Sequence, residues 1–333
     1  MNKLLTISIL LFAIACGNID NSKLDPSLLP ESTGKYGEVL VVVDTLYENR
    51  SSGEQLRKIF NKAMPGLPQE ETMFRMSTVA PESFKSILKR SRNLLKLNVG
   101  KGRKTDIAIE RNIWAKNQLM IQITAESDEV AARILKKNRQ TIRDYFNQEE
   151  IDRLHKQFAK KPEKDLIEEI KENYGLSLLI PPGFLMMQNT EEGFWIKKEK
   201  RLGEHQIIQG ISYYSEPYTG DSLFNKESIY ESRNRFTRKN MEGSRDSSFM
   251  VVYEPYPAKI TEQNFKGNYA KTYRGLWNME NDFMGGPFFH FATVDTVSNQ
   301  LLHLDGFVYA PKFNKREYVR ELEAIIKTLK LSN

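Results

Sequence analysis

Three residues with acid–base side chains, His290, His303 and Asp305, fall on two neighbouring segments that read as β-strands, residues 287–297 and 300–309. If Ser298 and Asn299 form a two-residue hairpin turn, all three side chains share one face of the sheet. The predicted cross-strand pairs are His290 with Phe307, Ala292 with Asp305, and Val294 with His303. Two imidazoles and a carboxylate can serve acid–base catalysis or supply half of a metal site.

The same three residues also fit the wet face of a half-buried sheet, which is the interpretation that we favour. Asp152 and His155 have a spacing that can bind metal, but no other ligand accompanies them, and a surface pair is the better interpretation. The sequence contains no Gly-x-Ser-x-Gly elbow, phosphate-binding glycine loop, His-Glu-x-x-His motif or dinucleotide fingerprint. We therefore assign no catalytic residue, metal or cofactor.

Aromatic side chains around a glycine pair, in residues 274–291, suggest a second kind of site. Trp and Tyr offer flat apolar faces with a polar edge, on which a sugar or a peptide can stack. The candidate binding residues are Trp195, Arg274, Trp277, Phe283 and Phe288. They fit core and turn positions equally well, and we favour that interpretation because strand alternation buries every second residue.

The first 16 residues read as a secretory signal that ends at Cys16. Lys3, a short apolar run and small residues before the cysteine predict a signal peptide over residues 1–15 and lipidation of Cys16. The alternative is an ordinary signal that leaves a free thiol. Cys16 is the only cysteine of the chain, and an exported protein gains little from one unpaired thiol, so we favour lipidation.

The predicted location of the protein and its composition limit the classes of molecule that it can bind. A lipidated Cys16 implies a bilayer as one partner and the cell envelope as the location, facing the periplasm or the outside. The chain has 333 residues, of which 40% are hydrophobic and 28% are charged, and this suits a globular body behind a tether. Its net charge of +6 could favour anionic membrane or glycan surfaces. We expect an envelope glycan, peptide or protein as ligand, and no nucleic acid.

The order of elements predicts an α+β protein with two mixed α/β domains. Residues 16–35 read as the tether, 36–174 as an N-terminal α/β domain with a helical linker, and 175–333 as a C-terminal domain. The run EVLVVVD at residues 38–44 predicts a buried strand of the first domain. Tight turns between the later strands predict an antiparallel sheet with helices packed on it, closed by a helix over residues 314–329.

Six short blocks carry a family resemblance. They are GLPQE from Gly66, RNLL from Arg92, RGLW from Arg274, MGGPF from Met284, GFVYAP from Gly306 and ELEAI from Glu321. Together they resemble an uncharacterised lipoprotein family of Bacteroidota, domain of unknown function 4837. The resemblance implies an envelope lipoprotein with no assigned activity. The element order of the C-terminal half is similar to the Mog1/PsbP-like α-β-α sandwich, which implies a fold and not a function.

Three classes of function follow from these observations. The one that we favour is a membrane-tethered, non-catalytic binding or accessory module of the cell envelope. The second is an envelope hydrolase that uses the face with His290, His303 and Asp305. The third is a structural partner in an outer-membrane complex.

Overall fold

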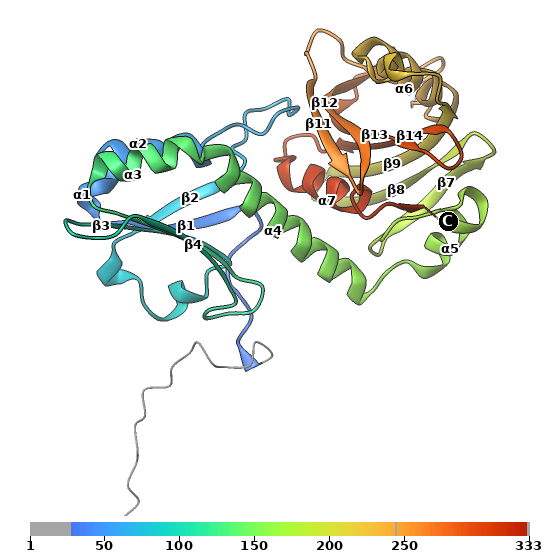
Figure 1. The fold of residues 1–333 in the computed structure, drawn as a ribbon. Helices are drawn as coiled ribbons and strands as arrows, with labels where there is room; N and C mark the ends of the chain where they lie inside the picture. The colour runs from blue at the N-terminus through green and yellow to red at the C-terminus, as the bar shows by residue number, and fades with distance from the viewer. Residues whose placement is uncertain (1–27, 244, 332–333) are drawn as a thin grey trace, which may run out of the picture.

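The computed structural model describes residues 28–243 and 245–331, which form two lobes connected by one long helix, α4 (Arg139–Lys160) (Figure 1). The N-terminal lobe contains the elements before α4, and the C-terminal lobe contains the elements after it. The predicted signal peptide and Cys16 lie outside the described residues. None of the helices in the described part combines the length and the apolar composition that crossing a bilayer requires.

The N-terminal lobe is built on a five-stranded sheet with the order β2-β1-β3-β5-β4. The strands are β1 (Glu38–Val42), β2 (Arg75–Val79), β3 (Asn93–Val99), β4 (Asp106–Arg111) and β5 (Leu119–Ala125). All pairings are parallel except that of β4 with β5. Alternate residues of β1 face opposite sides, so Val39 and Val41 enter the main core of this lobe.

Helices cover one face of this sheet more completely than the other. Helices α1 (Thr45–Glu48), α2 (Ser51–Phe60) and α3 (Asp128–Lys137) follow their strands, and α2 and α3 place Phe60 and Leu135 in the main core. The opposite face carries the two short 3-10 helices η3 (Pro81–Ser83) and η4 (Ser86–Arg90), next to a smaller cluster around Phe84. The chain after Pro81 therefore forms two separate 3-10 turns on this face.

The C-terminal lobe is built on an antiparallel eight-stranded sheet with the order β10-β12-β13-β14-β9-β8-β7, in which β11 also pairs with β12. The strands are β7 (Phe184–Thr190), β8 (Gly193–Leu202), β9 (His205–Pro217), β10 (Phe249–Val252), β11 (Lys259–Phe265), β12 (Asn268–Glu280), β13 (Gly285–Asp295) and β14 (Gln300–Tyr309). Helix α6 (Lys226–Asn240), which follows the 3-10 helix η5 (Asp221–Phe224), packs on one face, and α7 (Arg316–Ile326) packs on the other. The α+β class and the α-β-α layering expected for this half are confirmed.

The last residues close the lobe on its first ones. Helix α5 (Lys164–Tyr174) places Leu166 and Ile170 in the same core as α7, and the short strand β6 (Leu176–Ser177) follows it. Strand β15 (Lys330–Leu331) pairs antiparallel with β6. The first and the last strand of this lobe, β6 and β15, therefore lie side by side.

Helix α4 belongs to both cores. Its first half places Ile142 and Phe146 in the core of the N-terminal lobe. Its second half places Ile151, Leu154 and Phe158 in the core of the C-terminal lobe, where α4 contacts α7. Because one continuous helix is buried at both ends, each lobe restrains the position of the other.

The loop over residues 61–74 makes a second connection. It leaves the N-terminal lobe and places Met64 and Leu67 in the core of the C-terminal lobe. The carboxylate of Glu71 accepts hydrogen bonds from the backbone N–H groups of Lys315 (2.6 Å) and Arg316 (3.1 Å). These are the first residues at the start of α7, which has no side-chain cap of its own. Glu71 therefore fastens the N-terminal lobe to the N-terminus of α7.

Candidate functional site

The residues predicted for acid–base chemistry do share one face of the second sheet. His290 lies opposite Asp305 and Ala292 lies opposite His303 on β13 and β14. The predicted pairs were wrong by two residues, because the strands are joined by four residues, 296–299, instead of two. A shift by two keeps every side chain on its own face, and the predicted grouping survives the error.

These side chains form a continuous chain of contacts. His290 Nδ1 lies 3.2 Å from Asp305 Oδ2, and His290 Nε2 lies 3.2 Å from His303 Nδ1. His303 Nε2 lies 3.0 Å from Glu216 Oε1 on β9. At the other end, Arg233 of α6 donates to both oxygens of Asp305, at 2.9 and 3.1 Å. All four imidazole nitrogens therefore have a partner.

The face is buried, contrary to our expectation of a wet face. His290, His303, Asp305 and Arg233 are each 0% exposed, because α6 covers them. Tyr214 stacks on His303 with ring centroids 4.6 Å apart and an angle of 9° between the planes. Only Glu216, whose side chain is 23% exposed, connects the chain of contacts to solvent.

Every charged group of this cluster has an oppositely charged or hydrogen-bonding partner. The two imidazoles lie between the carboxylates of Asp305 and Glu216, and the Arg233 guanidinium pairs with Asp305. Buried charges are costly unless they are paired and hydrogen-bonded, and this arrangement meets that condition.

The pKa shifts of His303, Glu216 and Asp305 show which of these side chains carry a charge at pH 7. Burial lowers the pKa of His303 to about 4, so this imidazole is neutral at pH 7. The hydrogen bond from His303 lowers the pKa of Glu216 to about 2. Burial opposes the charge of Asp305, but the Arg233 guanidinium and His290 outweigh that effect and hold the pKa of Asp305 below its usual range.

The candidate binding residues lie in separate parts of the C-terminal lobe. Trp195 and Trp277 line a cavity of about 160 Å³ on the α6 side of the sheet, which we call the indole pocket. Phe283 lies in the turn between β12 and β13 and is 88% exposed. Phe288 is buried beneath Arg233, and Arg274 pairs with Glu323 of α7 on the opposite face of the sheet.

The indole pocket lies where five strands, β8, β9, β10, β12 and β14, meet the chain that follows α6. Its lining is mainly apolar and includes four methionines. The lining residues are Trp195, Lys197, Ile208, Met241, Glu242, Gly243, Met250, Trp277, Met279, Met284, Phe307 and Tyr309. The Nε1 atom of Trp277 is buried and has no hydrogen-bond partner among the described residues.

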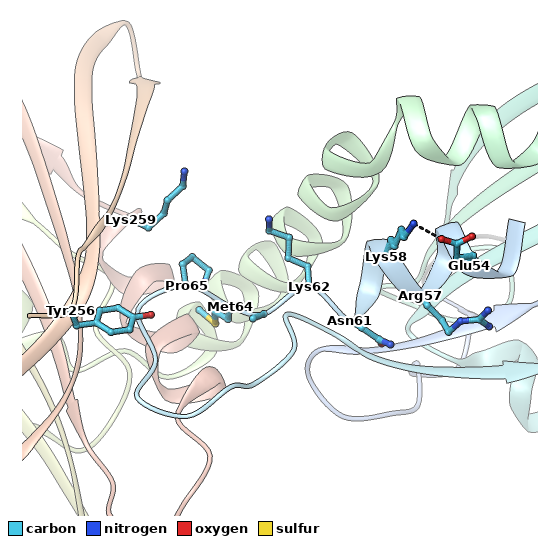
Figure 2. Close-up of a pocket in the computed structure, with 10 residues that line it drawn as sticks. Glu54, Arg57, Lys58, Asn61, Lys62, Met64, Pro65, Tyr256 and Lys259 are labelled. Carbon is cyan, nitrogen blue, oxygen red and sulfur yellow. Dashed lines mark hydrogen bonds and ion pairs between the residues drawn. The ribbon is translucent and has the colours of Figure 1, made fainter. Parts of the chain in front are cut away.

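A third feature, which we call the lobe cleft, was not predicted from the sequence. It is an open hollow of about 910 Å³ between the lobes. Its lining comes from α2, from the loop after it, and from the chain that enters β11 (Figure 2). The lining residues are Glu54, Arg57, Lys58, Asn61, Lys62, Ala63, Met64, Pro65, Tyr256 and Lys259. No sequence motif predicts this site, because the two segments that form its walls lie almost 200 residues apart in the chain.

The charges of the lobe cleft are mostly uncompensated. Glu54 forms an ion pair with Lys58, and Arg57 donates to the backbone oxygen of Glu48. The amines of Lys62 and Lys259 have no partner among the described residues. Figure 2 shows Lys259 on one side of Met64 and Pro65 and Lys62 on the other.

The remaining sequence candidates have ordinary partners. His155 Nε2 lies 2.8 Å from the backbone oxygen of Ala324, and Asp152 accepts from Gln148. In the part of the chain that the structure describes, no group of three metal-binding side chains occurs. Cys16 lies outside that part.

Two family models match the chain. Residues 163–328 match the model described as Domain of unknown function (DUF4837), and residues 32–159 match the model described as Domain of unknown function (DUF8532). The resemblance to domain of unknown function 4837 that was read from the sequence is thus confirmed for residues 163–328. The blocks that begin at Gly66 and Arg92 fall within the second match. A comparison with curated proteins gives no match.

Solved structures similar to this chain include Mog1 proteins. The Ran-binding protein Mog1p of Saccharomyces cerevisiae is 11% identical, and the match covers 48% of this chain and 91% of that chain, with a TM-score of 0.32. A point mutant of protein Mog1 is 9% identical over 48% and 92%, with a TM-score of 0.29. A structure from Bacteroides thetaiotaomicron is 11% identical over 48% and 46%, with a TM-score of 0.20.

Proposed function

We propose that this protein is a lipid-tethered module of the cell envelope that binds an acidic glycan in the lobe cleft and performs no catalysis. The observation that carries the proposal is the surplus of positive charge in a concave site. Four basic side chains and one acidic side chain line the cleft, and the acidic one is already paired.

The chemistry of the lining suits an acidic sugar polymer. Lys62 and Lys259 carry amines without partners, and an open, basic hollow concentrates anions near its walls. Between them, Met64 and Pro65 supply an apolar floor, and the ring of Tyr256 offers a flat face on which a sugar ring can stack. The openness of the hollow suits a chain that passes through it.

The two connections between the lobes support binding without closure of the cleft. Helix α4 is buried in both cores, and Glu71 fixes the cleft loop to α7. The walls therefore have a set spacing before any ligand arrives, which lowers the entropic cost of binding.

The buried cluster argues against the hydrolase alternative. His290, His303 and Asp305 are fully buried, and every ring nitrogen of the two imidazoles already has a partner. A general acid or base must come within hydrogen-bond reach of its substrate. The cluster fits a structural role in the core.

The ligand is tested with the purified protein and a heparin hexasaccharide as the acidic probe, with maltohexaose as its neutral counterpart. We expect the acidic probe alone to bind, and salt to weaken its binding because exposed charges are screened. Replacing Lys62 and Lys259 together by glutamine should weaken binding about tenfold in calorimetry, at roughly 0.7 kcal/mol for each exposed charge.

The matched control replaces Lys101 and Lys160, two exposed lysines outside the cleft lining, by glutamine. This variant has the same net charge and should bind as the parent protein does. An equal loss in both double variants would mean that overall charge attracts the glycan, and the cleft proposal would fail.

The tether is tested by cell fractionation of the full chain. We expect the parent protein in the membrane fraction and a Cys16→Ser variant in the soluble fraction, because the acyl chains supply the anchoring energy. If the variant stays with the membranes, the tether proposal is wrong, whatever the cleft binds.

A further inference from the structure

We propose that the indole pocket is an anchor site for one aromatic side chain of a peptide segment, and that it favours a side chain with a hydrogen-bond acceptor, as tyrosine has. This site lies on the α6 side of the C-terminal lobe and shares no lining residue with the lobe cleft. The inference is therefore independent of the glycan and of the tether.

The size of the pocket selects a single side chain. Its volume is about 160 Å³. Pockets for whole drug-sized ligands start near 300 Å³, whereas an apolar cavity of about 150 Å³ accepts a benzene ring. One six-membered aromatic ring therefore fits the space, and the rest of its bearer must remain outside.

The lining suits an aromatic guest. Trp195, Trp277 and Phe307 supply ring faces and edges, and the Trp195 and Phe307 centroids lie 6.2 Å apart. Four methionines line the same space, and their flexible, polarisable side chains adapt to the outline of a ring and make favourable sulfur–aromatic contacts.

An unsatisfied donor sets the polarity of the guest. Trp277 is 2% exposed, and its Nε1 atom has no partner among the described residues. A buried N–H without an acceptor is unfavourable, and a guest that brings an acceptor oxygen removes that cost. A ring with a hydroxyl group should therefore bind more tightly than the same ring without one.

The surroundings of the pocket offer contacts to a longer segment. Phe283 directly precedes the lining residue Met284 and is 88% exposed, with the guanidinium of Arg245 4.8 Å from its ring centroid. Lys197 and Glu242 add one charge of each sign to the lining. An anchored aromatic ring surrounded by apolar and polar contacts is the usual organisation of a peptide or protein interface.

The test uses p-cresol as the tyrosine-like probe, toluene as the same ring without the hydroxyl, and octanol as an acyl-like probe. The chain contains three tryptophans, so the indole N–H signals can be followed separately in 15N-labelled protein. We expect p-cresol to shift the Trp277 and Trp195 signals in a saturable way and to leave Trp114 of the N-terminal lobe unchanged. Its affinity should exceed that of toluene by about fivefold.

Two variants separate the pocket from the donor. Met284→Trp, which adds bulk to the lining, should abolish the response while circular dichroism remains unchanged. Trp277→Phe keeps an aromatic ring and removes the N–H, so p-cresol and toluene should then bind equally, as followed through the Trp195 signal. Equal binding of the two probes in the parent protein, tighter binding of octanol, or no saturable shift would each overturn the proposal.

Discussion

Replacing Asp305 by asparagine should destabilise the C-terminal lobe strongly, although the two side chains have almost the same shape. The carboxylate of Asp305 and the guanidinium of Arg233 are both 0% exposed, and two hydrogen bonds join them. Asparagine removes the negative charge and leaves a buried cation without a counter-charge. Breaking a buried pair in this way costs about 3–5 kcal/mol.

The measurement is urea unfolding followed by tryptophan fluorescence. In a Trp114→Phe background the signal comes only from Trp195 and Trp277, which both lie in the C-terminal lobe. With a slope of about 2.5 kcal/mol per molar urea, the midpoint should fall by roughly 1.5 M.

A second substitution checks the reasoning. Combining Asp305→Asn with Arg233→Met removes both charges, and it should recover most of the loss because no unpaired cation remains. A loss of less than about 1 kcal/mol in the single variant would show that the pair does not carry the assumed electrostatic energy. A double variant as unstable as the single one would place the cost in packing instead of charge.

Three further predictions concern pH and the connection between the lobes. Acidification from pH 7 to pH 5 should lower the free energy of unfolding by about 2 kcal/mol through His303, because the unfolded imidazole binds a proton near pH 6.5 and the folded one only near pH 4. Urea unfolding at a series of pH values measures this change. A His303→Gln variant should lose most of the pH dependence. Glu71→Gln should lower the free energy of thermal unfolding by about 1–2 kcal/mol, because it weakens the cap of α7. Glu70→Gln, at an exposed position, should leave that free energy unchanged. Gly66→Ala should lower the free energy of unfolding by more than about 1 kcal/mol, since the φ of Gly66 is +79° and a Cβ there would lie 2.9 Å from Arg274 of β12. Gly203→Ala is the control in the same assay. It should have a smaller effect, because Gly203 has a φ of +59° but open space around it.

Much of the fold follows from short-range sequence patterns. The strands predicted at residues 38–44 and 300–309 are β1, which ends two residues earlier, and β14, which has the same bounds. Both are strongly apolar and end at turn residues. The strand at Lys259–Phe265 (β11) was missed, because its sequence KITEQNF is mostly polar and alternates only weakly.

The candidate site was harder to predict because its surroundings come from distant parts of the chain. Strand alternation placed His290, His303 and Asp305 on one face, but only the packing of α6 decides that this face is buried. Alternation places Arg274 and Trp277 on opposite faces of β12, but it could not tell that α7 covers the first face and α6 the second. The lobe cleft depends on two chain segments that meet only after both lobes have folded.

The lipid anchor at Cys16 and the boundary between residues 174 and 175 stay predictions. Helix α5 concerns the second of these directly, since it places Leu166 and Ile170 in the core of the C-terminal lobe although both precede that boundary. Limited proteolysis of the purified protein would locate the boundary in solution.

The double burial of α4 has a consequence for biosynthesis. A nascent chain that has reached residue 160 contains every element of the N-terminal lobe, yet the half of α4 with Ile151, Leu154 and Phe158 still lacks the surface that will cover it. That surface includes α7, and the C-terminal lobe is complete only when Leu331 pairs with Leu176. During synthesis of the remaining residues this apolar stripe is accessible, and a holdase chaperone would find its binding site there.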